Sequence, residues 1–448
     1  MNKSTLALAV AVGVLAQQAG AAGFIEDSKA TLGLRNFYIN NDNRDSAATT
    51  NKAEEWGQGF DLRFTSGYTQ GTVGFGIDAI GLLGIKLDSG GGTNGASNNS
   101  YGGTVFPSKS NGEAVDNYSS LGLTAKAKIS QTELKLGTLQ PKLPVIVTND
   151  GRLLPQTFQG GQITSNEIKD LTLVGGQIEH AKGRNSSNNE ELSIAGANGR
   201  TASGRDSNKF IYGGGDYKIT KDLTAQYYYG NLDDFYKQHF LGLVHNWAIG
   251  PGVLKSDLRY FNSRSDGANG NDSTYYSSGN YTGSTSGRGK VDNNLYSGLF
   301  LYTVAGHTFG GGYQVSNGSS DFPWLNQGDG SSAYLTTDMQ IAKFARAGER
   351  TWQGRYSYDF AKLGVPGLTA GVIYLRGDNI DTVGSNGREN GSGRSEWERD
   401  ITVGYVVPEG PLKNVGVMWK NATWRNDVPG QRDQDENRLI VSYSLPLL

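Results

Sequence analysis

The chain has 448 residues, and its 41 Lys and Arg nearly balance its 43 Asp and Glu, for a formal net charge of −2. This balance disfavours a nucleic-acid partner, which would favour a basic stripe, and the absence of cysteine excludes disulfides and thiolate chemistry. The mean hydropathy of −0.47 excludes a bundle of membrane helices. It remains compatible with a membrane β-barrel, in which one face of every strand and the loops are polar.

Residues 1–22 are expected to be a signal peptide for export. Lys3 supplies the basic start, residues 6–16 form an apolar run, and the small residues of 19–22 suit cleavage. A short buried helix is the alternative. No later segment approaches the ~18 consecutive apolar residues of a membrane helix. The rest of the chain, 23–448, contains no Pro-rich or charged linker, so we expect a single domain.

Short segments in which apolar and polar residues alternate recur along this domain. They cover residues 60–65, 73–78, 121–128, 133–136, 223–229 and 254–260. The clearest is 352–360, where Trp352, Tyr356, Tyr358 and Phe360 share one parity and Gln353, Arg355, Ser357 and Asp359 share the other. Successive side chains of a strand point to opposite sides, so one face is apolar and the other polar. Such alternation predicts strands of a membrane barrel with lipid outside and water inside.

The connections between these segments are of two kinds. Tight turns are expected near Pro366 and at 408–411, whereas long connections rich in Gly, Ser, Asn and Asp cover 88–117, 183–208, 263–293, 316–335 and 377–395. Outer-membrane barrels combine short periplasmic turns with long extracellular loops. With roughly ten residues per strand, the chain has room for about 18 strands. The predicted fold class is therefore all-β: a transmembrane antiparallel β-barrel whose last strand, 438–447, closes the sheet.

The connection 138–162 is expected to fold inward and narrow the pore. Its three prolines exclude a regular central strand, and its apolar residues require burial that the barrel wall could provide. Asn149 begins an Asn-Asp-Gly motif that favours a tight turn. Asp150 and Arg152 would then project into the pore as an acid–base pair. A surface loop with a small apolar cluster is the alternative.

The segment 321–350 is the second candidate for an infolded loop, with residues 322–325 as its apolar anchor. Tyr334, Asp338 and Lys343 could oppose the cations of the barrel wall. An acidic group there would pair with an ammonium group while the wall cations hold a carboxylate. That arrangement would select zwitterions such as amino acids or short peptides.

Several sequence runs occur in a fixed order along the chain. They are GFIEDSK at 23–29, LRNFY at 34–38, EWGQGF at 55–60, QPKLP at 140–144, NDGRLLP at 149–155, RAGERTWQGRY at 346–356, GVPGL at 364–368, GYVV at 404–407 and GPLKNVG at 410–416. Together they resemble the OprD family of substrate-specific porins, also called outer-membrane carboxylate channels. The resemblance implies an 18-stranded barrel, a monomer or loose trimer, with inward-folded loops. It also implies a row of inward basic residues, the basic ladder, that guides small carboxylates.

Six cations are the candidates for this ladder. Arg or Lys on the lipid face near mid-bilayer would cost ~2–4 kcal/mol, so cations in strand centres should face the lumen. The candidates are Arg63, Lys126, Lys128, Arg259, Arg355 and Lys420. The alternative is that these cations only pair with wall carboxylates such as Asp61, Glu133, Asp257 and Asp359. Ile373 and Met418 stand where family members often carry a basic residue, so the resemblance implies a sparse ladder.

The sequence therefore predicts a passive outer-membrane diffusion channel of a Gram-negative bacterium. Its solutes would be small and carboxylate-bearing: amino acids, short peptides or organic acids. Its other partners would be outer-membrane lipid and lipopolysaccharide. No catalytic site, cofactor or metal is expected, since the four histidines lie in no recognisable motif. A barrel hydrolase, and an adhesin or receptor barrel that binds through its long loops, are the alternatives.

Overall fold

The computed structural model describes residues 23–44, 52–89, 104–194, 206–268, 290–326, 332–383 and 389–448. The expected signal peptide, residues 1–22, lies outside the described residues. Within the described ranges, no helix is both long and apolar enough to cross a membrane.

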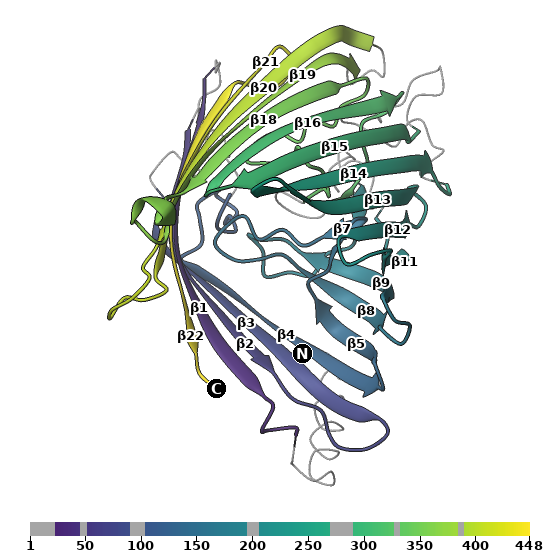
Figure 1. Cartoon of the computed structure of the whole chain (residues 1–448), viewed down its shortest axis with the longest axis vertical. Coiled ribbons are helices and arrows are strands. Elements are labelled where there is room, and N and C mark those ends of the chain that lie inside the picture. The colour runs from purple at the N-terminus through teal and green to yellow at the C-terminus, as the bar shows by residue number, and fades with distance from the viewer. Residues whose placement is uncertain are drawn as a thin grey trace.

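Within these ranges, eighteen strands form one closed antiparallel sheet. Figure 1 shows how the strands are arranged around the barrel. The wall strands are β1 (Lys29–Asn43), β2 (Lys52–Thr65), β3 (Gly74–Asp88), β4 (Asn117–Ile129), β5 (Thr132–Leu139), β8 (Thr157–Ser165), β9 (Leu171–Lys182), β11 (Phe210–Lys218), β12 (Leu223–Leu232), β13 (Tyr236–Ile249), β14 (Gly252–Ser265), β15 (Asp292–Val304), β16 (His307–Gly318), β18 (Arg350–Asp359), β19 (Leu368–Val383), β20 (Glu389–Val406), β21 (Gly416–Asn426) and β22 (Gln434–Pro446). The fold and strand number predicted from sequence are confirmed.

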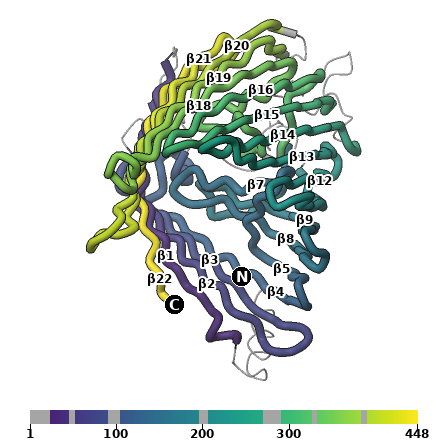
Figure 2. Tube along the Cα trace, viewed as in Figure 1, coloured from purple at the N-terminus to yellow at the C-terminus, as the bar shows by residue number. Residues whose placement is uncertain are grey.

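The barrel closes where the two ends of the chain meet. β22 pairs with β1 from Thr31 opposite Pro446 to Asn43 opposite Gln434. In Figure 2 the yellow C-terminal strand runs beside the purple N-terminal strand. Closure leaves no open edge of unsatisfied backbone groups, which a lipid environment would not tolerate.

The long connections gather at one end of the barrel. In an up-and-down barrel, every second connection lies at the same end. Two-residue turns join β4 to β5, β13 to β14 and β15 to β16, and all three lie at the end opposite the long connections. One predicted loop is wrong: β19 and β20 extend through most of 377–395, pairing as far as Val383 opposite Glu389, with register shifts beyond Gly377.

The exposure of β18 confirms the predicted parity of its side chains. Trp352 and Tyr356 are 45% and 39% exposed, whereas Thr351 and Gln353 are buried. The expected strand is one residue too long, because Phe360 begins the short 3-10 helix η3 (Phe360–Leu363). Asp359 caps this helix by accepting a hydrogen bond from the N–H of Ala361. Asp359 is therefore not the wall carboxylate that neutralises Arg355.

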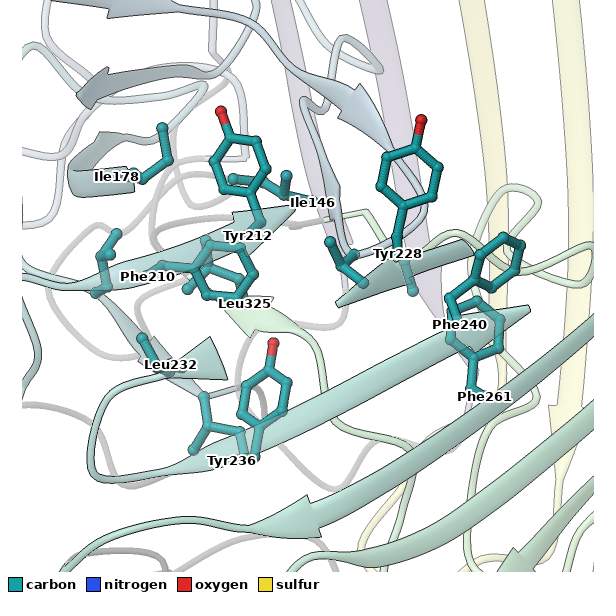
Figure 3. Packing of buried hydrophobic residues seen from close by; sticks show 14 of the residues in the cluster. Ile146, Ile178, Phe210, Tyr212, Tyr228, Leu232, Tyr236, Phe240, Phe261 and Leu325 are labelled. Carbon is teal, nitrogen blue, oxygen red and sulfur yellow. The ribbon is translucent and has the colours of Figure 1, made fainter. Parts of the chain in front are cut away.

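The inner face is less polar than the alternation predicted. Phe210, Tyr228, Phe240 and Phe261, from β11 to β14, are fully buried, and the close view of Figure 3 shows them packed with loop residues such as Leu325. The cover comes from the loops inside the barrel, which present apolar side chains to this part of the wall. One side of the lumen is thus filled by a hydrophobic core.

Candidate functional site

The first infolded loop, residues 140–156 between β5 and β8, crosses the lumen. Near its start, Val145 packs against Gly230 of β12, where an added Cβ would lie 2.9 Å from the Cβ of Val145. Further along, Asp150 forms an ion pair with Arg35 of β1 at 2.7 Å. The strand order places β12 and β1 on nearly opposite sides of the barrel. A loop that touches both walls must span the pore, and its strand β7 (Ile146–Val147) lies inside the ring of strands in Figure 1.

The second infolded loop, residues 319–349 between β16 and β18, joins the first within the barrel. Val147 and Ser332 form a β-bridge between the two loops. The short strand β17 (Leu325–Asn326) pairs with β10 (Ser193–Ile194) of the connection after β9. Three connections therefore form one plug-like layer against the wall, and this layer narrows the lumen.

Wall arginines hold the backbone of the second infolded loop. Arg259 of β14 donates to the carbonyl of Tyr334 at 3.1 Å, Arg355 of β18 to that of Thr336, and Arg438 of β22 to that of Gln340 at 3.1 Å. The acceptors follow one another along the loop as the donors follow one another around the barrel. The row of cations and the loop thus lie at the same level of the pore.

The predicted residues of the first loop lie at its crossing of the lumen, with partners that differ from the prediction. Asn149 accepts from the N–H of Gly151 at 2.8 Å, which forms the expected tight turn, and from Arg184 at 2.9 Å. Asp150 pairs with Arg35, and Arg152 lies 3.7 Å from Glu436 of β22. Asp150 and Arg152 are therefore not an acid–base pair with each other. The wall supplies a closer counter-charge for each.

The predicted residues of the second loop mainly brace that loop. The ring of Tyr334 lies 4.0 Å from the guanidinium of Arg259. Asp338 accepts from Lys343 at 3.2 Å and from the N–H of Ala333 at 2.9 Å. Since both carboxylate oxygens are engaged inside the loop, Asp338 does not present a free acid to the opposite wall.

Four of the six ladder candidates are neutralised or stacked by neighbours. Arg63 pairs with Asp61, and Arg259 pairs with Asp257, both at 2.7 Å. Lys126 is 5% exposed and lies 2.7 Å from Asp78. The ammonium group of Lys128 lies 5.7 Å from the ring centroid of Tyr68. For Arg63 and Arg259, the partners are two of the wall carboxylates that we expected if the cations only form ion pairs within the wall.

Arg355 and Lys420 form no ion pair within 4.0 Å in the part of the chain that the structure describes. Lys128 forms none there either, but it lies at the end of β4, next to the turn to β5 and away from the infolded loops. The strand register places Ile373 between Arg355 and Asp400, and Thr402 opposite Lys420. Ile373 therefore faces the lumen, in the row of charged residues. Arg355 and Lys420 both lie on the wall from β18 to β2, on the side of the lumen opposite the hydrophobic core of β11 to β14.

Sequence reasoning missed several residues of this region: Arg35, Glu398, Glu436 and Arg438. Arg35 shares its face with Phe37 and Ile39, which are buried under apolar loop residues. That face therefore shows no polar alternation. Glu398 is fully buried and accepts three backbone N–H bonds of the second loop. The parity of Arg438 was readable from the alternation of the last strand, but the loop contacts that give these four residues a role were not.

Comparison with known proteins agrees with this architecture. The family model described as an outer membrane porin of the OprD family matches residues 22–447. The chain belongs to the OprD family. It is 37% identical to the porin-like protein GalP of Pseudomonas putida over 99% of this chain and 97% of that protein. It is 36% identical to Porin D of Pseudomonas aeruginosa over 100% of this chain and 99% of that protein.

Solved structures of OprD-family channels superpose closely on the barrel. The crystal structure of Pseudomonas aeruginosa OccK8 (OprE) has a TM-score of 0.86 and 64% identity, and covers 95% of this chain and 100% of that one. That of OccK9 (OpdG) has a TM-score of 0.83 and 42% identity, with the same coverage. This OprD-family protein is an outer-membrane channel of a Gram-negative bacterium and not an enzyme.

Proposed function

We propose that this channel passes small carboxylate-bearing solutes, including amino acids, short peptides and organic acids, along the cations of the wall from β18 to β2. The observation that carries the proposal is the position of Arg355 and Lys420. Both lack an ion-pair partner within 4.0 Å among the described residues, and Arg355 contacts the second infolded loop. A cation in a narrow passage that has no carboxylate in direct contact attracts anions and concentrates them there.

The neighbouring cations extend this path. Arg35 is 30% and Arg63 45% exposed at the side chain, so a solute that leaves Arg355 meets further guanidinium groups along the wall. Each is partly cancelled by its own carboxylate, which keeps the contact weak. Weak, neighbouring sites allow a solute to move on, whereas a single tight site would trap it.

A relative supports the class of solute. The crystal structure of Pseudomonas aeruginosa OpdK with vanillate, an aromatic carboxylate, is 38% identical and covers 95% of this chain with a TM-score of 0.81. In the present chain, Ile373 beside Arg355 offers an apolar contact next to a cation. Such a pair suits a carboxylate with a small apolar body.

Arg355→Ala tests the proposal. In planar bilayers, we expect the anion-to-cation permeability ratio to fall, and benzoate flux into liposomes to fall roughly fivefold, as a loss of about 1 kcal/mol of attraction would give. Arg350→Ala is the matched control, because Arg350 begins the same strand but is exposed and of the outward parity. An unchanged permeability ratio and benzoate flux in Arg355→Ala would refute the proposed role of the row.

A further inference from the structure

Four arginines of the described inner wall share one local arrangement. In each, Nε donates a hydrogen bond to the side chain two residues earlier, which lies on the same face of the strand. The pairs are Arg63 with Asp61 at 2.9 Å, Arg259 with Asp257 at 2.8 Å, Arg355 with Gln353 at 2.7 Å, and Arg438 with Glu436. The acceptor fixes one edge of the guanidinium and leaves the terminal nitrogens to reach other groups.

The acceptor is a carboxylate in three of these pairs and a neutral carboxamide only beside Arg355. Arg63 and Arg259 each close a second hydrogen bond to the same aspartate at 2.7 Å, so charge is cancelled within the pair. Gln353 carries no charge. Among the four arginines, Arg355 alone is thus oriented by its neighbour without being neutralised by it.

The position of Gln353 is well defined. Its side chain is buried, and Nε2 donates to the hydroxyl of Thr336 at 3.2 Å, which directs Oε1 toward Arg355. Nη2 of Arg355 donates to the carbonyl of Thr336. Gln353, Arg355 and Thr336 therefore form a small network at the second infolded loop, in which Nη1 of Arg355 has no partner among the described residues.

We propose that Gln353 determines the anion specificity of this pore, because it holds Arg355 in place without adding a carboxylate in contact with its guanidinium. Arg355 is then the main carboxylate-binding position at the level of the second infolded loop. Asp61 and Asp257 reduce the attraction of Arg63 and Arg259 for anions. The field of a cation paired with a carboxylate falls off faster with distance than that of a lone cation, and walls of low dielectric enlarge the difference. This inference rests on the proposed function.

The test exchanges charge between two such pairs. Gln353→Glu adds a carboxylate beside Arg355, and Asp61→Asn removes one beside Arg63, with almost no change of side-chain volume in either. The double variant Gln353→Glu/Asp61→Asn moves the carboxylate from one arginine to the other and keeps the total charge of the pore. The full-length channels are compared in planar bilayers, with reversal potentials in a KCl gradient and with the concentrations of benzoate and of neutral benzamide that halve the current.

We expect Gln353→Glu to raise the half-blocking concentration of benzoate about fivefold and to lower the anion preference toward that of Arg355→Ala. Asp61→Asn should raise the anion preference. Benzoate should still block the double variant poorly, although the total charge of that pore is the same as in the wild type. The half-blocking concentration of benzamide should be the same for all variants. Heat-modifiable migration on gels confirms that each barrel is folded.

The results distinguish a failure of the role of Gln353 from a failure of the proposed function. If Arg355→Ala lowers anion preference but Gln353→Glu does not, or if the double variant behaves as the wild type, the role of Gln353 is overturned and the carboxylate path stands. If Arg355→Ala has no effect either, the proposed function itself fails.

Discussion

Glu398 of β20 holds the second infolded loop through three consecutive backbone groups. Its carboxylate accepts the N–H groups of Gln340 at 3.1 Å, Ile341 at 3.0 Å and Ala342 at 2.6 Å. Each such hydrogen bond contributes roughly 0.5–1.5 kcal/mol, and a buried N–H group left without an acceptor costs about 1–3 kcal/mol. A single wall residue therefore has a large share in fixing the loop that narrows the pore.

Glu398→Gln tests this role. The carboxamide turns an NH2 group toward the loop N–H donors, so we expect the loop to lose about 2–3 kcal/mol of anchorage. Open-channel noise should increase and proteases should cut within residues 332–349, while the barrel stays folded. Glu409→Gln is the control, since Glu409 is exposed in the turn after β20. A channel as quiet and as protease-resistant as the wild type would show that Glu398 is dispensable.

The first infolded loop depends on two glycines of β2. A Cβ at Gly57 would lie 2.6 Å from Phe106 and 2.8 Å from Leu153, and one at Gly59 would lie 3.0 Å from Leu153. The absence of a side chain thus allows the loop to lie directly on the strand. Leu153 and Leu154 are buried in the same cluster as Phe37 and Phe106, which makes this contact an apolar anchor for the constriction.

Gly57→Val is expected to displace this anchor. Overpacking of a well-filled site costs typically ~1–3 kcal/mol, and the loop can yield more easily than the hydrogen-bonded wall. We expect a larger or more variable single-channel conductance in a barrel that still migrates as folded. Gly354→Val is the control, because a Cβ there meets nothing within 4 Å. Equal conductance histograms for the two variants would contradict the role given to Gly57.

At the scale of the whole molecule, the barrel contains two environments separated by one layer of backbone. The outer face exposes apolar side chains such as Leu241, which is 52% exposed. The inner face holds one hydrophobic cluster on the side of β8 to β15, and smaller clusters on β1, β3, β4, β19 and β21 beside the charged groups of the wall from β18 to β2. The loops therefore fill part of the lumen and direct the aqueous path to the charged part of the wall.

Leu241→Arg is expected to destabilise the barrel by ~2–4 kcal/mol, because it places a cation on the lipid face. Gln226→Arg is the matched control on the neighbouring strand. The side chain of Gln226 points inward, and its Nε2 donates to Oδ1 of Asp216 at 2.8 Å. Urea-induced unfolding in lipid vesicles measures the free energy of unfolding of both variants. Equal stability of the two variants would contradict the assignment of the faces.

The sequence by itself determined the barrel, its strand number and the orientation of β18, because period-two alternation and turn chemistry are local signals that each segment carries alone. It also indicated the two infolded loops through their prolines and apolar runs. Where alternation was absent, as around Arg35, or where a strand hairpin continued through a polar segment, as at 377–395, the local signal was insufficient.

Only the tertiary structure decided which charges meet. Asp150 pairs with Arg35, and Arg152 with Glu436, because the loop crosses the lumen to wall strands whose residues are more than a hundred positions away in sequence. The hydrophobic interior of β11 to β14 likewise depends on loops that return to cover it. Such pairings follow from closure of the barrel and the path of the loops within it. The difference between Arg63, which is paired with Asp61, and Arg355, which is bonded to the neutral Gln353, becomes evident only when those contacts are known.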